Sequence, residues 1–261
     1  MCVEFRKRSV YNESSFQIDN RRRQGSMHKA ERAIIMGAGM GTRLRPATDN
    51  LPKPLVRVNG VRIIDTVIGA LRANGIREIH IVTGYRAEAW QELLKDDPDL
   101  DLIYNPYYAE RNNISSMYEA REYLHSCVCV DGDNLIYRPE ILMPEFEFSG
   151  YAGIPARGQT DEWLMVADEN QMVRYTTKGG REGWQLFGVC HLSEEDGLRL
   201  RGFLEEEYVR NRRYDIYWDD VAMFLHRDAF RFQVHPIQWG DIQEIDSFEE
   251  LCELDPGYLR K

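Results

Sequence analysis

Glycines and basic residues that follow one short apolar run could bind a phosphate group. Residues 33–36 (Ala-Ile-Ile-Met) have the apolar character of a buried strand, and a glycine-rich segment at 37–41 follows directly. Glycine lets a backbone approach an anion closely and turn its N–H groups toward it. Arg43 and Lys53 add full positive charge nearby. The pattern predicts a phosphate-binding loop, although a glycine-rich turn without a ligand would have the same glycines.

Two better-known glycine motifs do not fit this loop. A Walker A loop ends in Gly-Lys-Ser/Thr, whereas Gly41 is followed by Thr42 and Arg43. A dinucleotide-binding fingerprint that starts at Gly37 would need a small sixth residue, and Thr42 stands there. The next expected strand also ends, at residues 83–85, without the acid that such a fingerprint uses to hold a ribose.

Acidic residues occur at two further places where ligands could bind. Asp131 and Asp133 follow an apolar run, and carboxylates at the C-terminal end of a parallel strand lie at the ligand crevice of an open α/β sheet. Asp246 lies just before an expected helix. Such oxygen ligands suit Mg²⁺, which keeps its waters and substrate phosphates. The plain alternatives are an Asx-type turn at the first place and a helix start favoured by the helix dipole at the second.

The composition limits the classes of protein to which the chain can belong. Its 261 residues are 43% hydrophobic and carry a formal net charge of -10, enough for one large α/β domain with a full core. This acidity argues against a nucleic-acid partner, so the phosphate site must be a local basic pocket. No apolar stretch approaches the roughly 18 residues of a membrane span, so we expect no membrane insertion. The cysteines form no metal-binding spacing, which favours buried thiols and a cytoplasmic location.

The elements that must position these residues can be read from the apolar patterns. Residues 1–30 are polar and basic and are expected to form a flexible N-terminal extension, which leaves one domain over residues 31–261. In its first part, strands alternate with helices, an order that predicts a mostly parallel sheet. The expected strands are 33–36, 79–83, 102–104 and 127–131, and the expected helices are 63–74, 86–95 and 115–124.

The pattern changes after residue 150. Short runs typical of antiparallel strands are expected at 151–155, 163–167, 172–176 and 185–190. Ser193 is expected to cap a long helix that reaches about residue 212. Ser247 and Glu250 form the capping-box pattern of a final helix.

Two motifs together resemble the signature of nucleotidyltransferases that activate sugar phosphates and related phosphomonoesters. They are Gly-x-Gly-x-Arg-x-x-Pro at residues 39–46 and Pro-Lys-Pro-Leu at residues 52–55. The resemblance implies a three-layer α/β/α Rossmann-like fold with a mainly parallel central sheet and a small antiparallel acceptor-binding subregion. Residues 31–149 would then be the nucleotide-binding half and residues 150–261 the acceptor-binding half.

The same resemblance assigns roles to individual residues. Asp133 and Asp246 would bind Mg²⁺, Arg43 would stabilise the leaving phosphates, and Lys53 would bridge the α-phosphate and the acceptor phosphate. These four residues would carry the catalysis. Nucleotide contacts are implied for Gly37, Ala38, Gly39, Met40, Gly41, Thr42, Arg43, Asn112, Ser115 and Asp131.

The segment Asn112-Asn113-x-x-Ser116 resembles the bacterial phosphocholine cytidylyltransferases, although Asn-Asn before a helix is also a plain cap. Residues 160–166, 214–220 and 244–247 look like segments of the same enzymes, and the resemblance covers about residues 33–254. A quaternary ammonium is recognised by aromatic faces, at about 0.5–2 kcal/mol per contact, and by a nearby negative charge. The expected walls and counter-charges are Trp163, Tyr217, Trp218, Asp219 and Asp220, whose aromatic rings could equally belong to the core.

The reaction implied by this resemblance joins CTP and phosphocholine to give CDP-choline and pyrophosphate, by Mg²⁺-assisted in-line attack on the α-phosphate. One alternative acceptor is 2-aminoethylphosphonate or another amino-phosphate, which would need carboxylates that accept hydrogen bonds from a primary ammonium. A sugar-1-phosphate is a second alternative. The third is an inactive nucleotide-binding regulatory protein, against which the joint presence of Arg43, Lys53, Asp133 and Asp246 argues.

Overall fold

The computed structural model describes residues 27–260, so most of the predicted N-terminal extension lies outside the described residues. The last residues of that extension belong to the fold. His28–Lys29 forms strand β1, which pairs with β9 (Glu145–Phe146), and Ala30 is buried. Residues 28–30 therefore pack on the domain although the sequence assigned them to the extension, because a two-residue strand has too little pattern to be recognised in sequence.

Four parallel strands form one side of the central sheet, in the order β7, β2, β5 and β6. Their bounds are β2 Arg32–Met36, β5 Glu78–Thr83, β6 Asp101–Tyr104 and β7 Cys127–Asp131. Ile35 of β2 is paired with Ile81 of β5 and with Val130 of β7. This part of the sheet confirms the parallel order predicted from alternating strands and helices.

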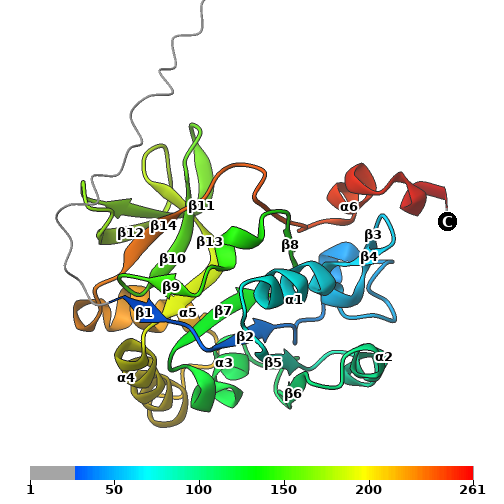
Figure 1. Cartoon of the computed structure of the whole chain (residues 1–261), viewed down its shortest axis with the longest axis horizontal. Coiled ribbons are helices and arrows are strands. Elements are labelled where there is room, and N and C mark those ends of the chain that lie inside the picture. The colour runs from blue at the N-terminus through cyan, green and yellow to red at the C-terminus, as the bar shows by residue number, and fades with distance from the viewer. Residues whose placement is uncertain (1–26, 261) are drawn as a thin grey trace, which may run out of the picture.

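The sheet continues into the second half without a break (Figure 1). Strand β13 (Trp184–Leu192) runs antiparallel to β7, with Cys190 opposite Cys129. Beyond it lie β10 (Gly150–Pro155), β11 (Thr160–Ala167), β12 (Val173–Gly180) and β14 (Gln233–Pro236). The antiparallel subregion is confirmed. The nine-stranded sheet as a whole is mixed, because β13 joins the two halves in the antiparallel sense.

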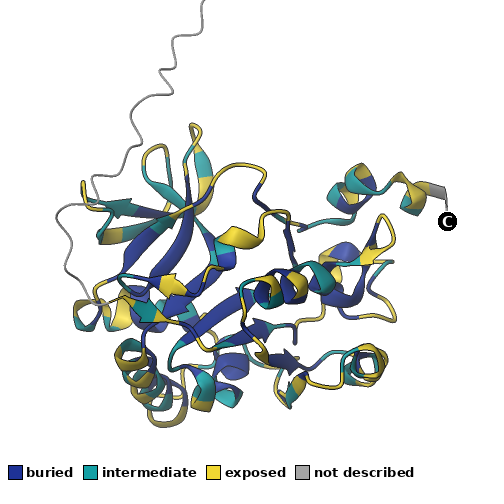
Figure 2. Cartoon of the chain, in the orientation of Figure 1, coloured by how far each residue is buried: buried dark blue, intermediate teal, exposed yellow. Residues whose placement is uncertain are grey.

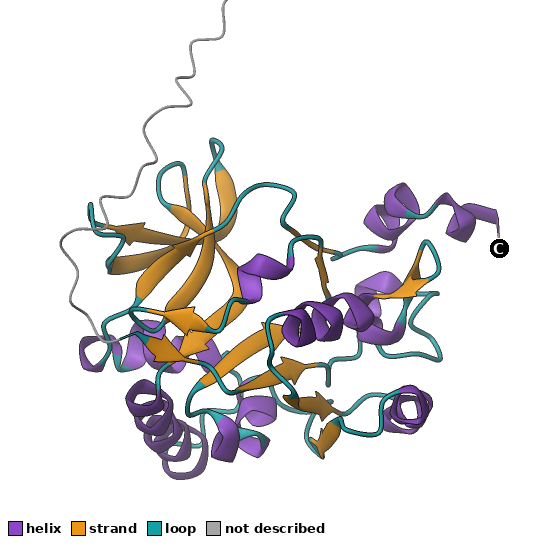
Figure 3. Cartoon of the chain, viewed as in Figure 1, coloured by secondary structure: helices purple, strands orange, loops and turns teal. Residues whose placement is uncertain are grey.

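Helices cover both faces of the sheet (Figure 3). Side chains alternate along β2, so Ile35 packs with α1 (Ile63–Ala73) and α2 (Trp90–Asp96), whereas Ile34 packs with the helices of the opposite face. Those helices are α3 (Ile114–Glu119), α4 (Glu194–Glu205) and α5 (Trp218–Asp220). The strands between the two layers are buried (Figure 2), which confirms the three-layer α/β/α architecture.

Short elements complete the fold and position the ligand-binding edge. They are β3 (Arg57–Val58), β4 (Val61–Arg62), β8 (Asn134–Ile136), β15 (Ile242–Glu244) and α6 (Phe248–Leu254). Helix α6 begins with the predicted capping box, in which the N–H of Glu250 donates to Ser247 Oγ at 3.2 Å. The predicted helix from residue 193 is regular only to Glu205, and a π-helical turn over Glu206–Arg210 follows. Among residues 27–260, no helix is both long and apolar enough to span a membrane.

Candidate active site

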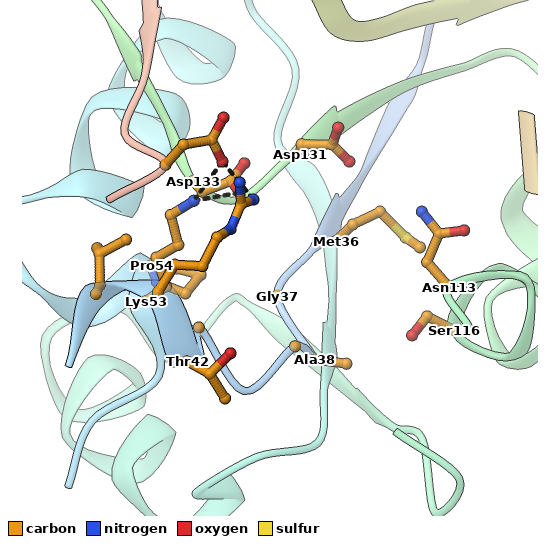
Figure 4. A pocket seen from close by; sticks show the side chains of 15 residues that line it. Met36, Gly37, Ala38, Thr42, Lys53, Pro54, Asn113, Ser116, Asp131 and Asp133 are labelled. Carbon is orange, nitrogen blue, oxygen red and sulfur yellow. Dashed lines mark hydrogen bonds and ion pairs between the residues drawn. The ribbon is translucent and has the colours of Figure 1, made fainter. Parts of the chain in front are cut away.

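The glycine-rich loop forms one wall of a cavity of about 320 Å³ at the carboxyl end of β2 (Figure 4). Two glycines are required by its geometry. A Cβ on Gly37 would lie 2.9 Å from the ring of Trp90, and Gly41 adopts a φ of 59°. The cavity is lined by Met36, Gly37, Ala38, Gly39, Gly41, Thr42, Arg43, Leu44, Lys53, Pro54, Asn113, Ser116, Asp131, Asp133 and Asp246. Of the loop residues predicted to contact the nucleotide, Met40 alone does not line it.

The four residues predicted to carry catalysis lie together in this cavity (Figure 4). Lys53 is buried, and its Nζ lies 2.7 Å from Asp133 Oδ2 and 3.7 Å from Asp246 Oδ1. Arg43 donates to the same Asp246 oxygen at 2.6 Å. These residues are far apart in sequence, and the pairing of β15 with β8 brings residues 244–246 beside the segment that carries Asp133.

The two carboxylates suit a magnesium ion. Asp133 Oδ1 is buried and has no hydrogen-bond partner, so the structure leaves one carboxylate oxygen free in the cavity. No group of three or more His, Cys, Asp or Glu side chains within residues 27–260 is arranged to hold a metal. Mg²⁺ does not need such a group, because it binds through one or two carboxylates together with substrate phosphates and water. The donor set of Asp133 and Asp246 therefore fits the ion predicted from the sequence.

Asp131 lies at the end of β7 and faces two cavities. Burial raises the pKa of its carboxyl well above the usual range, and the negative charges of Asp133 and Asp219 act in the same direction. A glycine across the sheet makes room for it, because a Cβ on Gly188 would lie 1.9 Å from Asp131 Oδ2. Asp131 therefore lines a second cavity as well as the one that holds the residues with which it was predicted to bind the nucleotide.

The residues that line the cavity at the start of α3 differ by one position from those predicted. Ser115 is fully buried, and its hydroxyl donates to Asn112 O at 2.8 Å and accepts from Asn105 Nδ2 at 2.9 Å. The Asn112 amide donates to Asp215 O at 3.0 Å and accepts from the N–H of Asn113. Asn112 and Ser115 therefore hold the backbone, and Asn113 and Ser116 face the cavity instead.

A second cavity of about 370 Å³ adjoins the first, and Arg43, Asn113, Asp131 and Asp246 line both. Its other walls come from the hairpin of β11 and β12, from β13, from residues 217–224 and from β15. They are Glu162, Trp163, Thr176, Lys178, Leu186, Gly188, Tyr217, Asp219, Asp220, Met223, Phe224 and Glu244. This is the position expected for an acceptor that must meet the nucleotide at a shared border.

Two of the three predicted aromatic walls line the second cavity. The ring of Trp163 packs against Phe224 with centroids 5.0 Å apart, and Tyr217 is 52% exposed. Trp218 is 4% exposed and lies in the core, with its ring 6.1 Å from that of Tyr151. The prediction that Trp218 is a wall is therefore wrong. Its side chain points into the core because it lies in the first turn of α5, whose inner face packs against the sheet.

The second cavity contains carboxyl groups with raised pKa values. Burial raises the pKa of Asp219 to about 7, and its Oδ1 accepts a hydrogen bond from the Tyr151 hydroxyl at 2.7 Å. Burial also raises the pKa of Glu244 to about 8, and Asp133 and Asp246 add to the effect by repulsion. Burial raises the pKa of Asp220 as well. None of these carboxyl groups forms an ion pair with Lys or Arg in the described chain.

Sequence reasoning missed several residues of the second cavity. Glu244 could have been found, because it is an acid only two residues before Asp246, which was already assigned, and it ends the strand β15. Glu162, Thr176 and Lys178 lie in an ordinary hairpin whose polar residues carry no spacing signal. Their placement depends on the register of β11 against β12, in which Trp163 is opposite Lys178.

Comparisons with known proteins agree with this geometry. Residues 32–145 match the family described as Nucleotidyl transferase. The chain is 35% identical over 239 residues to a 2-aminoethylphosphonate cytidylyltransferase of Lancefieldella rimae, which covers 90% of this chain and 96% of that protein. This chain belongs to the nucleotidyl transferase family. The predicted nucleotidyltransferase fold and family are thereby confirmed.

Other relatives are named for different acceptors. A choline-phosphate cytidylyltransferase of Streptococcus pneumoniae is 30% identical over 224 residues, which is 86% of this chain and 96% of that protein. The solved structure of CTP:phosphocholine cytidylyltransferase from Streptococcus pneumoniae has a TM-score of 0.79 at 30% identity and covers 87% of this chain and 98% of its own. An inositol-1-phosphate CTP transferase from T. maritima, at 20% identity and a TM-score of 0.68, covers 88% of this chain and 98% of its own and shares the fold. The names of the relatives therefore do not single out one acceptor.

Proposed function

We propose that this nucleotidyltransferase transfers a cytidylyl group from CTP to a small phosphonate or phosphate that carries a primary ammonium group, such as 2-aminoethylphosphonate. Pyrophosphate is the second product. The relatives support the cytidylyl group, because four that match over at least 85% of the chain are named as cytidylyltransferases. This proposal departs from the phosphocholine acceptor expected from sequence, and the reason lies in the second cavity.

The observation that carries the proposal is the placement of Lys178. Its Nζ lies 5.1 Å from the centroid of the Trp163 ring, and Phe224 packs against the same ring. A quaternary ammonium binds by contact with a free aromatic face. Because Lys178 already lies over that ring, a trimethylammonium group would meet an occupied aromatic face, whereas a primary ammonium can bind through hydrogen bonds to carboxyl groups instead. The aromatic cage expected from sequence is therefore incomplete, since Trp218 is absent from it too.

The carboxyl groups of the same cavity suit a primary ammonium. An –NH₃⁺ group has three N–H donors, whereas a trimethylammonium group has none. Glu162, Asp219, Asp220 and Glu244 line the cavity, and none of them is neutralised by an ion pair within residues 27–260. A bound ammonium would supply the missing positive charge and would lower the raised pKa values of Asp219 and Glu244.

The shared border of the two cavities supports an in-line transfer. An anionic oxygen of the acceptor attacks the α-phosphorus, a new P–O bond forms, and the bond to the pyrophosphate oxygen breaks. No proton has to be removed, so the chemistry depends on positioning and on charge neutralisation. Lys53 would contact the α-phosphate and the acceptor, and Arg43 would hold the leaving phosphates. Both cations are already within the cavity.

Mg²⁺ held by Asp133 and Asp246 would neutralise phosphate charge as a Lewis acid. In the structure, these carboxylates are paired with Lys53 and Arg43. The substrate phosphates would draw the two cations away from the carboxylates, which then become available to the ion. The internal ion pairs thus keep four charged side chains in place for the reaction.

Phosphocholine is the second candidate acceptor. The half-exposed ring of Tyr217 and the ring of Trp163 still offer aromatic surface in the cavity, and two relatives are named choline-phosphate cytidylyltransferase. If Lys178 turned away from Trp163, the free ring and the nearby carboxylates could accept a quaternary ammonium. This candidate differs from the first only in the head group of the acceptor.

The test is pyrophosphate release in the presence of Mg²⁺. CTP, UTP, ATP and GTP are each combined with 2-aminoethylphosphonate, phosphoethanolamine, phosphocholine and glucose-1-phosphate. The expected result is turnover with CTP and the primary ammonium acceptors, abolished by EDTA and restored by Mg²⁺. A clear preference for phosphocholine would replace the first candidate with the second. Turnover with glucose-1-phosphate alone would reject both, and no turnover with any pair would favour a nucleotide-binding regulatory protein.

A further inference from the structure

Asn113 lies between the two cavities and lines both of them. Its Oδ1 accepts a hydrogen bond from the backbone N–H of Trp218 at 2.9 Å. Since an amide oxygen that accepts this bond must face Trp218, the amide nitrogen faces the other way. Figure 4 shows this nitrogen on the side of the nucleotide cavity, pointing toward the end of β7 that carries Asp131.

The Asn113 contact is one of three hydrogen bonds between the same two segments. The N–H of Asn112 donates to Tyr214 O at 2.8 Å, and Asn112 Nδ2 donates to Asp215 O at 3.0 Å. The segment of residues 112–113 belongs to the wall of the first cavity, which we call the nucleotide cavity. Residues 214–218 lead directly into the wall of the second cavity, which we call the acceptor cavity. We refer to the contact of residues 112–113 with residues 214–218 as the bridge.

An arginine fixes one end of the bridge. The Arg111 guanidinium carbon lies 3.7 Å from the ring centroid of Tyr107 and 4.0 Å from that of Tyr214. The guanidinium also donates to the Tyr208 hydroxyl. The segments that carry Tyr107, Tyr208 and Tyr214 are thereby held around one planar cation. Neither Arg111 nor these tyrosines line either cavity.

The other end of the bridge carries residues that line the second cavity. Tyr217, Asp219 and Asp220 flank Trp218 and line the acceptor cavity. The N–H of Tyr217 donates to Asp220 Oδ2 at 2.8 Å, and Asp219 Oδ1 accepts from the Tyr151 hydroxyl. The Trp218 N–H therefore lies in the middle of residues 217–220, which we call the acceptor wall. Its hydrogen bond to Asn113 fixes the position of this wall relative to the nucleotide cavity.

Asn113 Nδ2 has no hydrogen-bond partner among residues 27–260. We propose that Asn113 is a positioning residue that couples the two substrates: its NH₂ group binds the nucleotide, which fixes its Oδ1 on the Trp218 N–H and orders the acceptor wall. The inference rests on the proposed function for the identity of the two substrates. Because coupling between binding sites is reciprocal, each substrate then raises the affinity for the other.

The test measures the Kd of 2-aminoethylphosphonate by calorimetry, with and without α,β-methylene-CTP and Mg²⁺, using the full chain. We expect the nucleotide analogue to raise the acceptor affinity of the wild-type protein at least about fivefold. Asn113→Ala removes both ends of the contact, so it should bind the acceptor more weakly and show no effect of the nucleotide. Asn113→Asp keeps an oxygen for the Trp218 N–H, so its acceptor affinity without nucleotide should stay near the wild-type value while the coupling is lost.

Asn74→Ala is the matched control. Asn74 Nδ2 also donates to backbone carbonyls, at 2.9 Å to Ala70 O and 2.6 Å to Pro139 O, and Asn74 lines neither cavity. This variant should keep the full coupling, and equal loss of coupling in it would overturn the proposal. Wild-type coupling that persists in Asn113→Ala would also overturn it. Wild-type turnover without coupling rejects the coupling alone, whereas absence of both binding and turnover rejects the proposed function with it.

Discussion

The two adjoining cavities hold their charges in different ways. In the nucleotide cavity, each predicted catalytic cation already contacts a carboxylate, Lys53 at 2.7 Å from Asp133 and Arg43 at 2.6 Å from Asp246. In the acceptor cavity, Asp219, Asp220 and Glu244 have no such partner, and burial raises their pKa values. The two cations of the first cavity are thus paired with carboxylates, with Asp131 left unpaired, whereas the second cavity holds several carboxyl groups without an ion-pair partner among residues 27–260.

This difference indicates which kind of ligand each cavity is suited to bind. A cavity with matched charges can take a ligand that brings both signs, as a nucleoside triphosphate with its metal does. A cavity with excess carboxyl groups favours a cation, because burial of an unpaired charge is costly. The balance of charge therefore distinguishes the nucleotide side from the acceptor side even where the residues at the border are shared.

The largest expected effect comes from removing the buried cation of the nucleotide cavity. Lys53→Ala should lower kcat by about 100- to 1000-fold, the usual cost of losing one well-placed charged donor at a reacting centre. It leaves Asp133 without its partner, so the free energy of unfolding should also fall. The measurement is pyrophosphate release together with thermal unfolding. Lys95→Ala, on the exposed side of α2, should change neither. Near-normal turnover in Lys53→Ala would show that Lys53 has no catalytic role.

The next effect tests the fit between Gly188 and Asp131. Because a Cβ on Gly188 would lie 1.9 Å from Asp131 Oδ2, Gly188→Ala should displace the carboxyl and destabilise the fold by about 1–3 kcal/mol. Turnover at low acceptor concentration should fall with it. Gly202→Ala is the matched control, since a Cβ there meets nothing within 4 Å and the residue lies in α4. That change should stabilise the protein by about 0.5–1 kcal/mol, as measured by chemical unfolding.

A smaller effect tests the acceptor selectivity. Lys178→Ala frees a face of Trp163, so the ratio of kcat/KM for phosphocholine to that for 2-aminoethylphosphonate should rise about threefold to thirtyfold. Lys178→Arg keeps a cation beside the ring and should leave the ratio near its wild-type value. Steady-state kinetics with both acceptors measures the ratio. An unchanged ratio in Lys178→Ala would show that the Lys178 contact does not select the head group.

The last prediction concerns stability alone and depends on pH. The pKa of Asp219 is about 7 in the folded protein. Between about pH 4 and pH 7 this carboxyl is therefore mostly protonated in the folded protein and ionised in the unfolded chain. It therefore lowers stability progressively as the pH rises from about 4 to about 7, and Asp219→Asn removes this loss. The groups that interact with Asp219 are Tyr151, Asp131, Cys129, Cys190 and Asp220. In thermal unfolding, the stability of Asp219→Asn relative to the wild type should increase up to about pH 7 and stay constant above it. A stability difference that does not change with pH would contradict the prediction.

The nucleotide side could be predicted from the sequence because its parts are local. The strand at residues 33–36, the glycines after it and the Pro-Lys-Pro-Leu segment are short, contiguous patterns, and the structure places them around one cavity. The parallel order followed from the alternation of strands and helices. The capping box at Ser247 is likewise a pattern of four residues, and it was confirmed. At the start of α3 the prediction is displaced by one residue, because Asn113 and Ser116 line the cavity in place of Asn112 and Ser115.

The acceptor side could be predicted only in outline. Strands were expected close to their observed bounds, but the residues that line the cavity depend on the register of β11 and β12 and on the turn before α5. Trp218 shows the difficulty, because neighbouring aromatic residues at 217 and 218 point in opposite directions and only one reaches the cavity. Lys178 depends on its cross-strand partner Trp163, a relation that a single sequence does not contain.

The hairpin of β11 and β12 has one further consequence. Trp163, Thr176 and Lys178 all lie on it, and it pairs with the rest of the sheet mainly through Leu164 and Met165 against β13. The nucleotide loop and the carboxylates of Asp133 and Asp246 lie outside it. Changes in this hairpin can thus alter one wall of the second cavity without touching the residues predicted to carry the catalysis. Exchange of residues 160–180 between relatives would measure how much of the head-group preference this wall carries, because Tyr217, Asp219, Asp220 and Glu244 would stay in place.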